Sequence, residues 1–193
     1  MKITDITTLC LSRPHEPERQ WVTAQYRSIK ADCAIVIIET DGNLRGIGEA
    51  CAYGDPLRIK ERVEALAKNL IGKDPEDPAI VPPAEGDDRS QDIPIAGIDC
   101  ALCDLRAKIA GKKVSELLTD NPLSKVRLYA SSGCMYDWDQ NPEQVVDEAV
   151  GYANDGFTAF KMRLGTHWEW SGVTPEQFIE LAQKVTDAVG DRM

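Results

Sequence analysis

The stretch after residue 125 restricts the fold of this chain most, because short strand-like segments alternate there with helical ones. Residues 126–131 and 158–165 have the composition of β-strands, and residues 141–156 and 174–190 repeat apolar side chains at helical spacing. Both helices start with the spacing of a capping box, Asn141 with Gln144 and Thr174 with Gln177. A strand–helix–strand–helix order is typical of a parallel βα array. We therefore expect parallel strands in this half of the chain.

The second of these strands carries two cations. Lys161 and Arg163 are two positions apart, so on a strand they point to the same side. Three apolar residues point to the other side and are expected to pack under a helix: Phe160, Met162 and Leu164. Two cations on one face of a buried strand require a nearby anion, supplied by the protein or by a substrate. The alternative is an edge strand whose long side chains reach water.

The first half of the chain predicts an antiparallel sheet. Residues 2–11, 31–39 and 44–50 read as strands, and Asp41-Gly42-Asn43 between the last two is a strong hairpin signal. Together they predict a three-stranded meander.

Helices are expected to cover this sheet. Asp55-Pro56 starts a first helix that ends at Gly72. Residues 73–91 read as a connection. A second helix has apolar residues spaced three and four apart and ends at Gly111: Ile95, Ile98, Leu102, Leu105 and Ile109. A short helix is expected at residues 114–118.

Two loops carry aromatic side chains. Residues 12–28 contain Trp21 and Tyr26, and residues 51–55 contain Tyr53. A loop as long as the first is usually functional or disordered. We expect these aromatics to cover a site; the alternative is that they are solvent-exposed in mobile loops.

Charge and hydropathy exclude several classes of protein. The chain has 22 basic and 32 acidic residues, a formal net charge of −10, which disfavours a general nucleic-acid binder. The longest strictly aliphatic run, residues 34–38, is too short to span a bilayer, so we expect no membrane association. Without a recognisable secretion signal, a cytoplasmic protein is expected.

Cysteine and histidine do not predict a metal site. Cys100 and Cys103 match C-x-x-C but lie in an apolar helical stripe, so we interpret them as buried small hydrophobes, with metal or redox use as a minor alternative. The two histidines, His15 and His167, are too far apart in sequence to predict a histidine-based site.

Three segments, taken in order, resemble the enolase superfamily, and within it the mandelate racemase and muconate lactonizing enzyme group. They are the hairpin ending at residues 46–50, the helix at residues 96–108 with the short segment 114–118, and the strand at residues 156–165. The resemblance implies an α+β capping domain, residues 1–122, with a three-stranded antiparallel meander and helices. It also implies that residues 123–193 start a (β/α) TIM-type barrel, which is truncated here.

The resemblance also implies a chemistry. In this family a divalent metal, usually Mg²⁺, holds a small carboxylate substrate while a base removes the proton on the neighbouring carbon. Lys161 and Arg163 are the implied catalytic residues, because barrel sites lie at the carboxyl ends of the strands. The implied substrate-binding residues are Ser131 near the end of the first barrel strand and three loop aromatics: Trp21, Tyr26 and Tyr53. A homo-oligomer is expected.

One departure concerns the base. The family pattern is commonly Lys-x-Lys, whereas this chain has Arg163 at the second position. Arginine stays protonated, so it clamps oxyanions well and is a poor base. We therefore favour an acid-sugar or hydroxy-acid dehydratase, with either Lys161 or a residue beyond 193 as the base. A racemase, epimerase or cycloisomerase of the same group is the alternative.

The other departure concerns length. From residue 126 onward there is room for about two of the eight βα units of a complete barrel. The family's acidic metal ligands lie on the third to fifth barrel strands, so the resemblance places them beyond residue 193 and implies no metal ligand in this chain. We expect the chain as given to be inactive. Two alternatives stay open: a non-catalytic interaction module, or an ordinary α/β protein whose two cations bind a structural anion.

Overall fold

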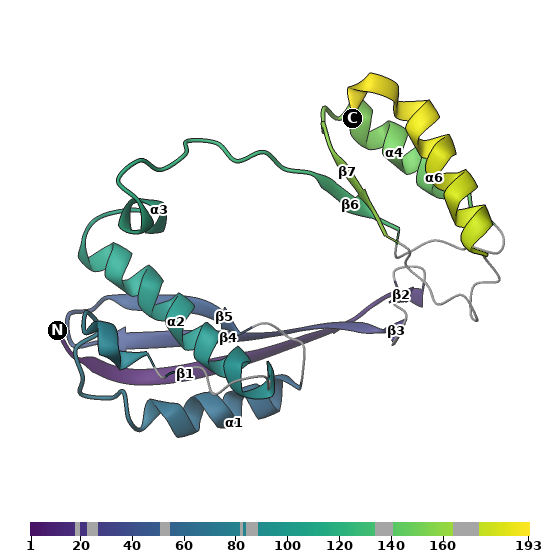
Figure 1. Cartoon of the computed structure of the whole chain (residues 1–193). Helices are drawn as coiled ribbons and strands as arrows, with labels where there is room; N and C mark the ends of the chain where they lie inside the picture. The colour runs from purple at the N-terminus through teal and green to yellow at the C-terminus, as the bar shows by residue number, and fades with distance from the viewer. Residues whose placement is uncertain are drawn as a thin grey trace. The chain divides into compact units, whose positions relative to one another are not determined.

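The computed structural model describes residues 1–17, 20–22, 27–50, 55–81, 83, 89–133, 141–163 and 174–193 (Figure 1). For residues 21–22 and 89–91 it describes the backbone alone. Contacts group the chain into two units: Met1–Arg13 with Ala31–Ser124, and Pro14–Lys30 with Lys125–Met193. Whether residues 1–122 and 123–193 are separate domains stays a prediction.

The first unit contains a three-stranded sheet. Its strands, in the order β1-β4-β5, are Ile3–Pro14, Lys30–Thr40 and Arg45–Ala50. β4 and β5 are antiparallel, with Val36 opposite Gly48. Asn43, with a φ of 57°, makes the turn between them, in a left-handed conformation that asparagine tolerates. The predicted antiparallel meander is therefore confirmed.

Two helices cover one face of this sheet: α1 (Pro56–Ala67) and α2 (Arg89–Ile109). The Asp55 carboxylate accepts a hydrogen bond from the Leu57 N–H at 3.0 Å, which confirms the predicted cap. α1 ends before the predicted Gly72, and α2 begins inside the predicted connection. The sheet and the helices share one core, which includes Ile6, Val36, Ile38, Ile59, Val63, Ile98, Leu102 and Leu105.

The contact between α2 and β5 is made by backbone. A Cβ atom on Gly48 would lie 2.3 Å from the Gly97 carbonyl oxygen and 2.4 Å from the Ala101 nitrogen. A Cβ atom on Gly46 would lie 2.0 Å from the Ala101 carbonyl oxygen. These distances are far below van der Waals contact, so helix and strand approach this closely only because both strand positions are glycine.

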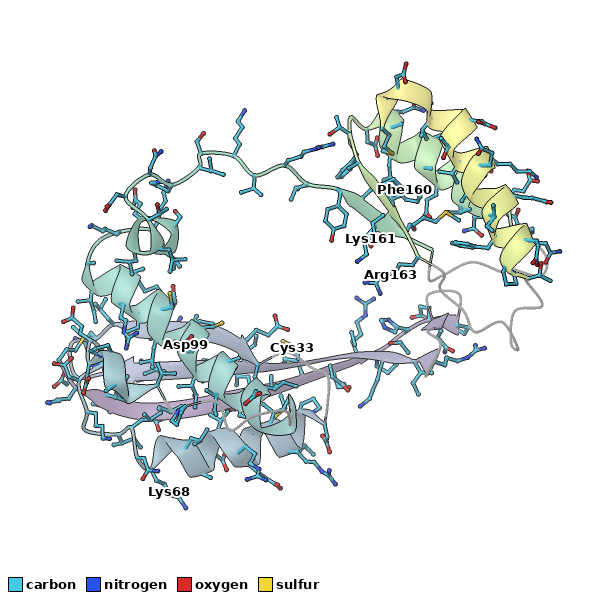
Figure 2. The ribbon with its side chains drawn as sticks, viewed as in Figure 1. Cys33, Lys68, Asp99, Phe160, Lys161 and Arg163 are labelled. Carbon is cyan, nitrogen blue, oxygen red and sulfur yellow. The ribbon has the colours of Figure 1, made fainter. Side chains whose placement is uncertain are left out.

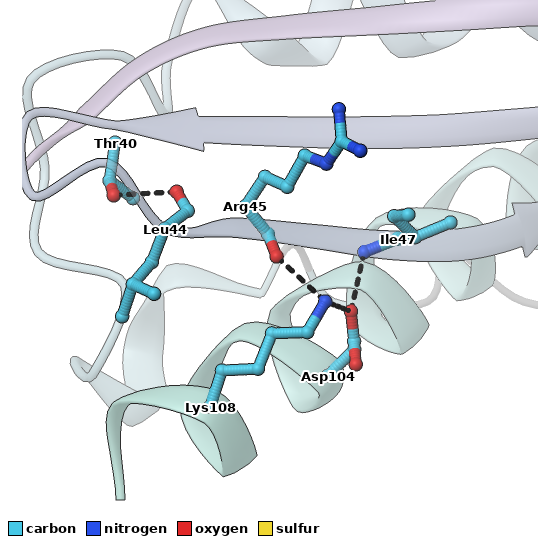
Figure 3. A network of polar contacts seen from close by, with 6 residues as sticks. All are labelled: Thr40, Leu44, Arg45, Ile47, Asp104 and Lys108. Atoms are coloured by element: carbon cyan, nitrogen blue, oxygen red, sulfur yellow. Dashed lines mark hydrogen bonds and ion pairs between the residues drawn. The ribbon is translucent and has the colours of Figure 1, made fainter. Parts of the chain in front are cut away.

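Side chains of α2 also bind the edge of β5 (Figure 3). The Asp104 carboxylate accepts from the Ile47 N–H at 2.8 Å. The Lys108 ammonium donates to the same carboxylate at 2.6 Å and to the Arg45 carbonyl oxygen at 2.9 Å. Backbone groups that an edge strand leaves unpaired therefore have partners here.

The second unit contains the predicted parallel strands. β6 (Ala130–Ser132) and β7 (Phe160–Met162) are parallel. β7 packs on α4 (Gln144–Asn154) and α6 (Pro175–Val189), and α6 continues into the 3-10 helix Gly190–Arg192. Their shared core consists of buried and half-buried apolar side chains: Val145, Ala149, Phe160, Met162, Phe178, Leu181, Val185 and Val189. The βαβα prediction is confirmed.

Shorter elements complete both units. The first holds the 3-10 helix Pro78–Ile80 and α3 (Val114–Leu118), which matches the predicted short helix. In the second, β2 (Trp21–Val22) pairs antiparallel with β3 (Arg27–Ser28), inside the segment that we expected to be a loop.

Three further sequence-based expectations were wrong in detail. The capping box Thr174–Gln177 is present, but α4 is capped at Glu143, and Asn141 only accepts a backbone turn bond at 3.2 Å. The predicted strand at residues 126–131 is regular only from Ala130, since β7 offers three residues for pairing. Of the two cysteines expected to be buried, Cys100 is exposed and Cys103 is half-buried.

Candidate active site

Three polar side chains of the second unit lie on one open face of the parallel strands. In the pairing of β6 with β7, Ser131 is opposite Lys161, and both side chains are exposed. Arg163, one residue past the end of β7, is also exposed. Because side chains alternate along a strand, Phe160 and Met162 point the other way and pack on the helices. Figure 2 shows Phe160 on the helix side of β7, with Lys161 and Arg163 away from it.

Tyr129 joins this face. The Lys161 ammonium lies 5.9 Å from the centre of the Tyr129 ring, which is within the range of a cation–π contact. The contact restrains a long side chain that would otherwise move freely. Sequence reasoning missed Tyr129, although its position two residues before Ser131 was a usable signal, since the two share a face in extended backbone.

A glycine positions Arg163. The Arg163 N–H donates to the Ser132 carbonyl oxygen at 2.8 Å, which extends the strand pairing by one residue. Gly133 has a φ of +106°, and a Cβ atom on it would lie 2.2 Å from the Arg163 carbonyl oxygen. No L-side chain fits this close approach. The backbone that carries Arg163 is therefore held by β6 at the carboxyl end of the pair.

The opposite end of the two strands is closed by a structural contact. The Arg127 guanidinium donates from Nε to the Thr158 hydroxyl at 2.9 Å and from a terminal nitrogen to the Thr158 carbonyl oxygen at 2.7 Å. A shallow hollow there is lined by these two residues, Leu128, Asp155, Gly156 and Phe157. Sites on parallel βα folds lie at the carboxyl ends of the strands, so this hollow is a weak candidate.

The structure brings together only part of the predicted site. Ser131, Lys161 and Arg163 share one face, as described above. Trp21 lies in β2, where it pairs with Ser28; the structure describes its backbone and not its side chain. Tyr26 and Tyr53 lie outside the described residues.

The exposure of the two cations differs from the buried strand that we expected. Only the helix-facing side of β7 is partly buried, while Lys161 and Arg163 face solvent, as in the edge-strand alternative. Neither charge requires a protein anion in this chain. A lysine, an arginine and a serine hydroxyl on one face can bind a carboxylate or hydroxyl-bearing anion from solution.

The described ranges hold no cluster of three or more histidine, cysteine, aspartate or glutamate side chains that could bind a metal. In the same ranges, no helix combines the length and the apolar character needed to cross a membrane.

Comparison with known proteins places the chain in a family. The family model for the N-terminal domain of mandelate racemase and muconate lactonizing enzyme matches residues 5–119. The cis-3-hydroxy-L-proline dehydratase of Roseibium aggregatum is 30% identical over 86% of this chain and 46% of that protein. The D-galactarolactone cycloisomerase of Agrobacterium fabrum is 30% identical over 100% of this chain and 50% of that protein.

Solved structures agree with this assignment. A crystal structure of an enolase-superfamily member from Polaromonas sp. JS666 matches 100% of this chain and 50% of its own, with a TM-score of 0.78 and 29% identity. The chain thus spans about half the length of the relatives it matches. The family model matches more than half of the chain, and the solved structure matches all of it. This chain therefore belongs to the mandelate racemase and muconate lactonizing enzyme group of the enolase superfamily.

Proposed function

We propose that this chain forms the capping part and the first two barrel strands of an enzyme that removes the proton α to a carboxylate, acting as a dehydratase of a hydroxy acid or sugar acid. The observation that carries the proposal is the shared open face of Ser131, Lys161 and Arg163 at the carboxyl ends of two parallel strands. The dehydratase relative from Roseibium aggregatum supports the reaction class.

Each residue has a distinct role in this proposal. Arg163, whose planar guanidinium presents a fork of N–H donors, binds the substrate carboxylate or a hydroxyl oxygen. Ser131 donates its hydroxyl hydrogen to a second substrate oxygen. Lys161, as the neutral amine, accepts the α-proton, and the electron pair of the C–H bond moves toward the carboxylate. The electron pair then returns to form a C=C bond as the β-hydroxyl leaves. The leaving hydroxide takes the proton that Lys161 has accepted, which gives water and restores the neutral amine.

The metal that the family implies does not fit the described residues. Magnesium prefers several converging oxygen ligands, and the described part of the chain holds no such group. The proposal places the Mg²⁺ ligands outside residues 1–193, and a cytoplasmic location and a homo-oligomer stay predictions.

A cycloisomerase is the second candidate. The galactarolactone cycloisomerase matches the whole length of this chain at 30% identity. In this proposal the cycloisomerase and the dehydratase both begin by removing the α-proton. They differ in the group that leaves the substrate and in the atom to which the proton returns. Release of water with an unsaturated product supports the dehydratase, and a product that is an isomer of its substrate supports the cycloisomerase.

The test is exchange of the substrate α-proton with deuterated solvent, in a form of the protein that contains the complete barrel. Lys161→Ala should slow exchange by about 10²- to 10⁴-fold, the usual contribution of a general base. Lys125→Ala, an exposed lysine before β6, is the matched control and should exchange at the wild-type rate. Unchanged exchange in Lys161→Ala would remove Lys161 from the role of base.

A further inference from the structure

A carboxylate lies on the inward face of α4, on the same stripe as apolar and aromatic side chains. Four residues share this face because they stand at positions i, i+3, i+4 and i+7 of the helix: Val145, Glu148, Ala149 and Tyr152. Val145 and Ala149 are fully buried, and the Tyr152 ring packs on the Phe160 ring with the centroids 6.0 Å apart. Glu148 is half-buried. Apolar residues usually fill such a stripe, so the carboxylate needs an explanation other than packing.

This carboxylate binds the last residue of β6. Glu148 accepts a hydrogen bond from the hydroxyl of Ser132, which is also half-buried. A hydrogen bond to a charged acceptor is stronger than one between neutral groups, and it constrains direction as well as distance. Truncation of either side chain would deprive a half-buried polar group of this bond, which costs free energy. The pair therefore ties the end of β6 to α4.

The same residue of β6 holds the backbone of Arg163. The Ser132 carbonyl oxygen accepts from the Arg163 N–H at 2.8 Å. The next residue, Gly133, is buried and lies so close to the Arg163 backbone that a Cβ atom on the glycine would be 2.2 Å from the Arg163 carbonyl oxygen. Because the two backbones are in contact here, a shift of Ser132 moves Arg163 with it.

We propose that Glu148 is a positioning residue for Arg163 and acts through Ser132. The Glu148 carboxylate holds the hydroxyl of Ser132, and the carbonyl of Ser132 holds the Arg163 N–H. The position of the guanidinium on the open strand face therefore depends on a carboxylate on the helix side of the same strands. A misplacement of about 1 Å at a substrate-binding group can lower turnover about a hundredfold, so this support affects the chemistry. The inference rests on the proposed function, in which Arg163 binds a substrate oxygen.

Amide hydrogen exchange in the 1–193 chain, followed by NMR, tests the link between the three residues. The Arg163 N–H should exchange about tenfold faster or more in Glu148→Ala and in Ser132→Ala, because each variant loses one charge-assisted hydrogen bond. The Ala130 N–H, which donates to the Ala159 carbonyl oxygen at 3.0 Å at the other end of the strand pair, should keep its rate. Equal acceleration of both amides would mean that Glu148 only stabilises the fold, and an unchanged Arg163 rate would mean that the link is absent. Either result overturns the proposal.

Kinetics of a form with the complete barrel test the consequence for the site. Glu148→Ala should lower kcat/KM by about tenfold, and Glu148→Gln, whose amide oxygen can accept the same hydrogen bond, should recover most of the loss. In an Arg163→Ala background, Glu148→Ala should cost nothing further, because the side chain to be positioned is gone. Asp147→Ala removes the exposed neighbouring carboxylate of α4 and is the matched control, with wild-type exchange and kcat/KM expected.

Three kinetic outcomes contradict the inference, and circular dichroism melts check that every variant is folded. Wild-type kcat/KM in Glu148→Ala overturns it. A loss from Glu148→Ala that is equally large with and without the Arg163 side chain overturns it too, and leaves the proposed function standing. Wild-type kcat/KM in Arg163→Ala overturns the proposed function and the inference with it.

Discussion

The two units pack strands against helices in opposite ways. In the first, β5 meets α2 backbone to backbone, because glycine stands at positions 46, 48 and 97 where any Cβ atom would collide. In the second, β7 rests on α4 and α6 through the side chains of Phe160 and Met162, and the other face of β6 and β7 is open. The first unit gains rigidity from close approach, whereas the second leaves Lys161 and Arg163 free to meet a ligand.

This difference separates the residues that determine stability from those that determine chemistry. A change at the glycine contact should damage folding, while a change on the open strand face should damage binding or catalysis and leave folding intact.

The largest effect is expected from Gly48→Ala. Its methyl group would lie 2.3 Å from the Gly97 carbonyl oxygen, and backbone cannot move aside without shifting α2. Because the colliding atoms are backbone, the loss should exceed the usual overpacking range of about 1 to 3 kcal/mol and reach about 5 kcal/mol in the free energy of unfolding, measured by urea denaturation followed by circular dichroism. Gly151→Ala, in an open part of α4, should instead stabilise by about 0.5 to 1 kcal/mol. Equal effects of the two changes would contradict the backbone contact.

Equivalent leucine truncations in the two units give the next effect. Leu102 is fully buried in the larger core, so Leu102→Ala should cost about 3 to 5 kcal/mol. Leu181, 5% exposed, lies in the smaller core, where most neighbouring side chains are only partly buried, and Leu181→Ala should cost about 2 kcal/mol. Amide hydrogen exchange, read separately for each unit, should show lost protection mainly in the unit that carries the change. Losses spread evenly over both units would mean that they unfold together.

Arg163→Lys probes the open face. Lysine keeps the charge but loses the planar fork that binds two oxygens, so kcat/KM of a form with the complete barrel should fall by about tenfold. The melting temperature should not change, since the side chain is exposed. Arg127→Lys is the matched control: it loses the two bonds to Thr158 and should lower stability rather than turnover. Wild-type kinetics in Arg163→Lys would exclude a two-oxygen clamp.

The smallest effect concerns Cys100 on the first unit. Desolvation of its thiol beside the sheet raises the pKa, even though much of the side chain is exposed, and the negative charges of Asp99 and Cys103 raise it further. A raised pKa leaves less thiolate near neutral pH. It also makes the folded state lose stability as the pH rises from the ordinary cysteine pKa, where the thiol of the unfolded chain ionises, toward the raised pKa of the folded chain. Iodoacetamide should therefore label Cys100 more slowly in the folded chain than in the denatured chain, with the difference shrinking at high pH.

Peptide mass spectrometry measures this labelling at each pH. Asp99→Asn removes one of the charges and should speed labelling of the folded chain. Labelling of the folded chain as fast as that of the denatured chain would contradict the raised pKa.

Local patterns in the sequence determined the type and order of the main elements. The Asp41-Gly42-Asn43 turn, the caps at Asp55 and Thr174, and the period of apolar residues act between neighbours a few positions apart, so one sequence suffices to read them. The alternation of side chains along a strand likewise placed Lys161 and Arg163, two positions apart, on one face.

Tertiary structure alone decided which distant residues meet and how deeply each is buried. The alignment of Ser131 with Lys161 depends on how two strands about thirty residues apart slide into register, which strand periodicity does not specify. The exposure of Lys161, Arg163 and Cys100 depends on what packs above them. The glycines of the hairpin could be read as part of a family motif, but their reason is the approach of a helix about fifty residues further along the chain. Burial and register are properties of pairs of distant segments, so they become visible only when the chain is folded.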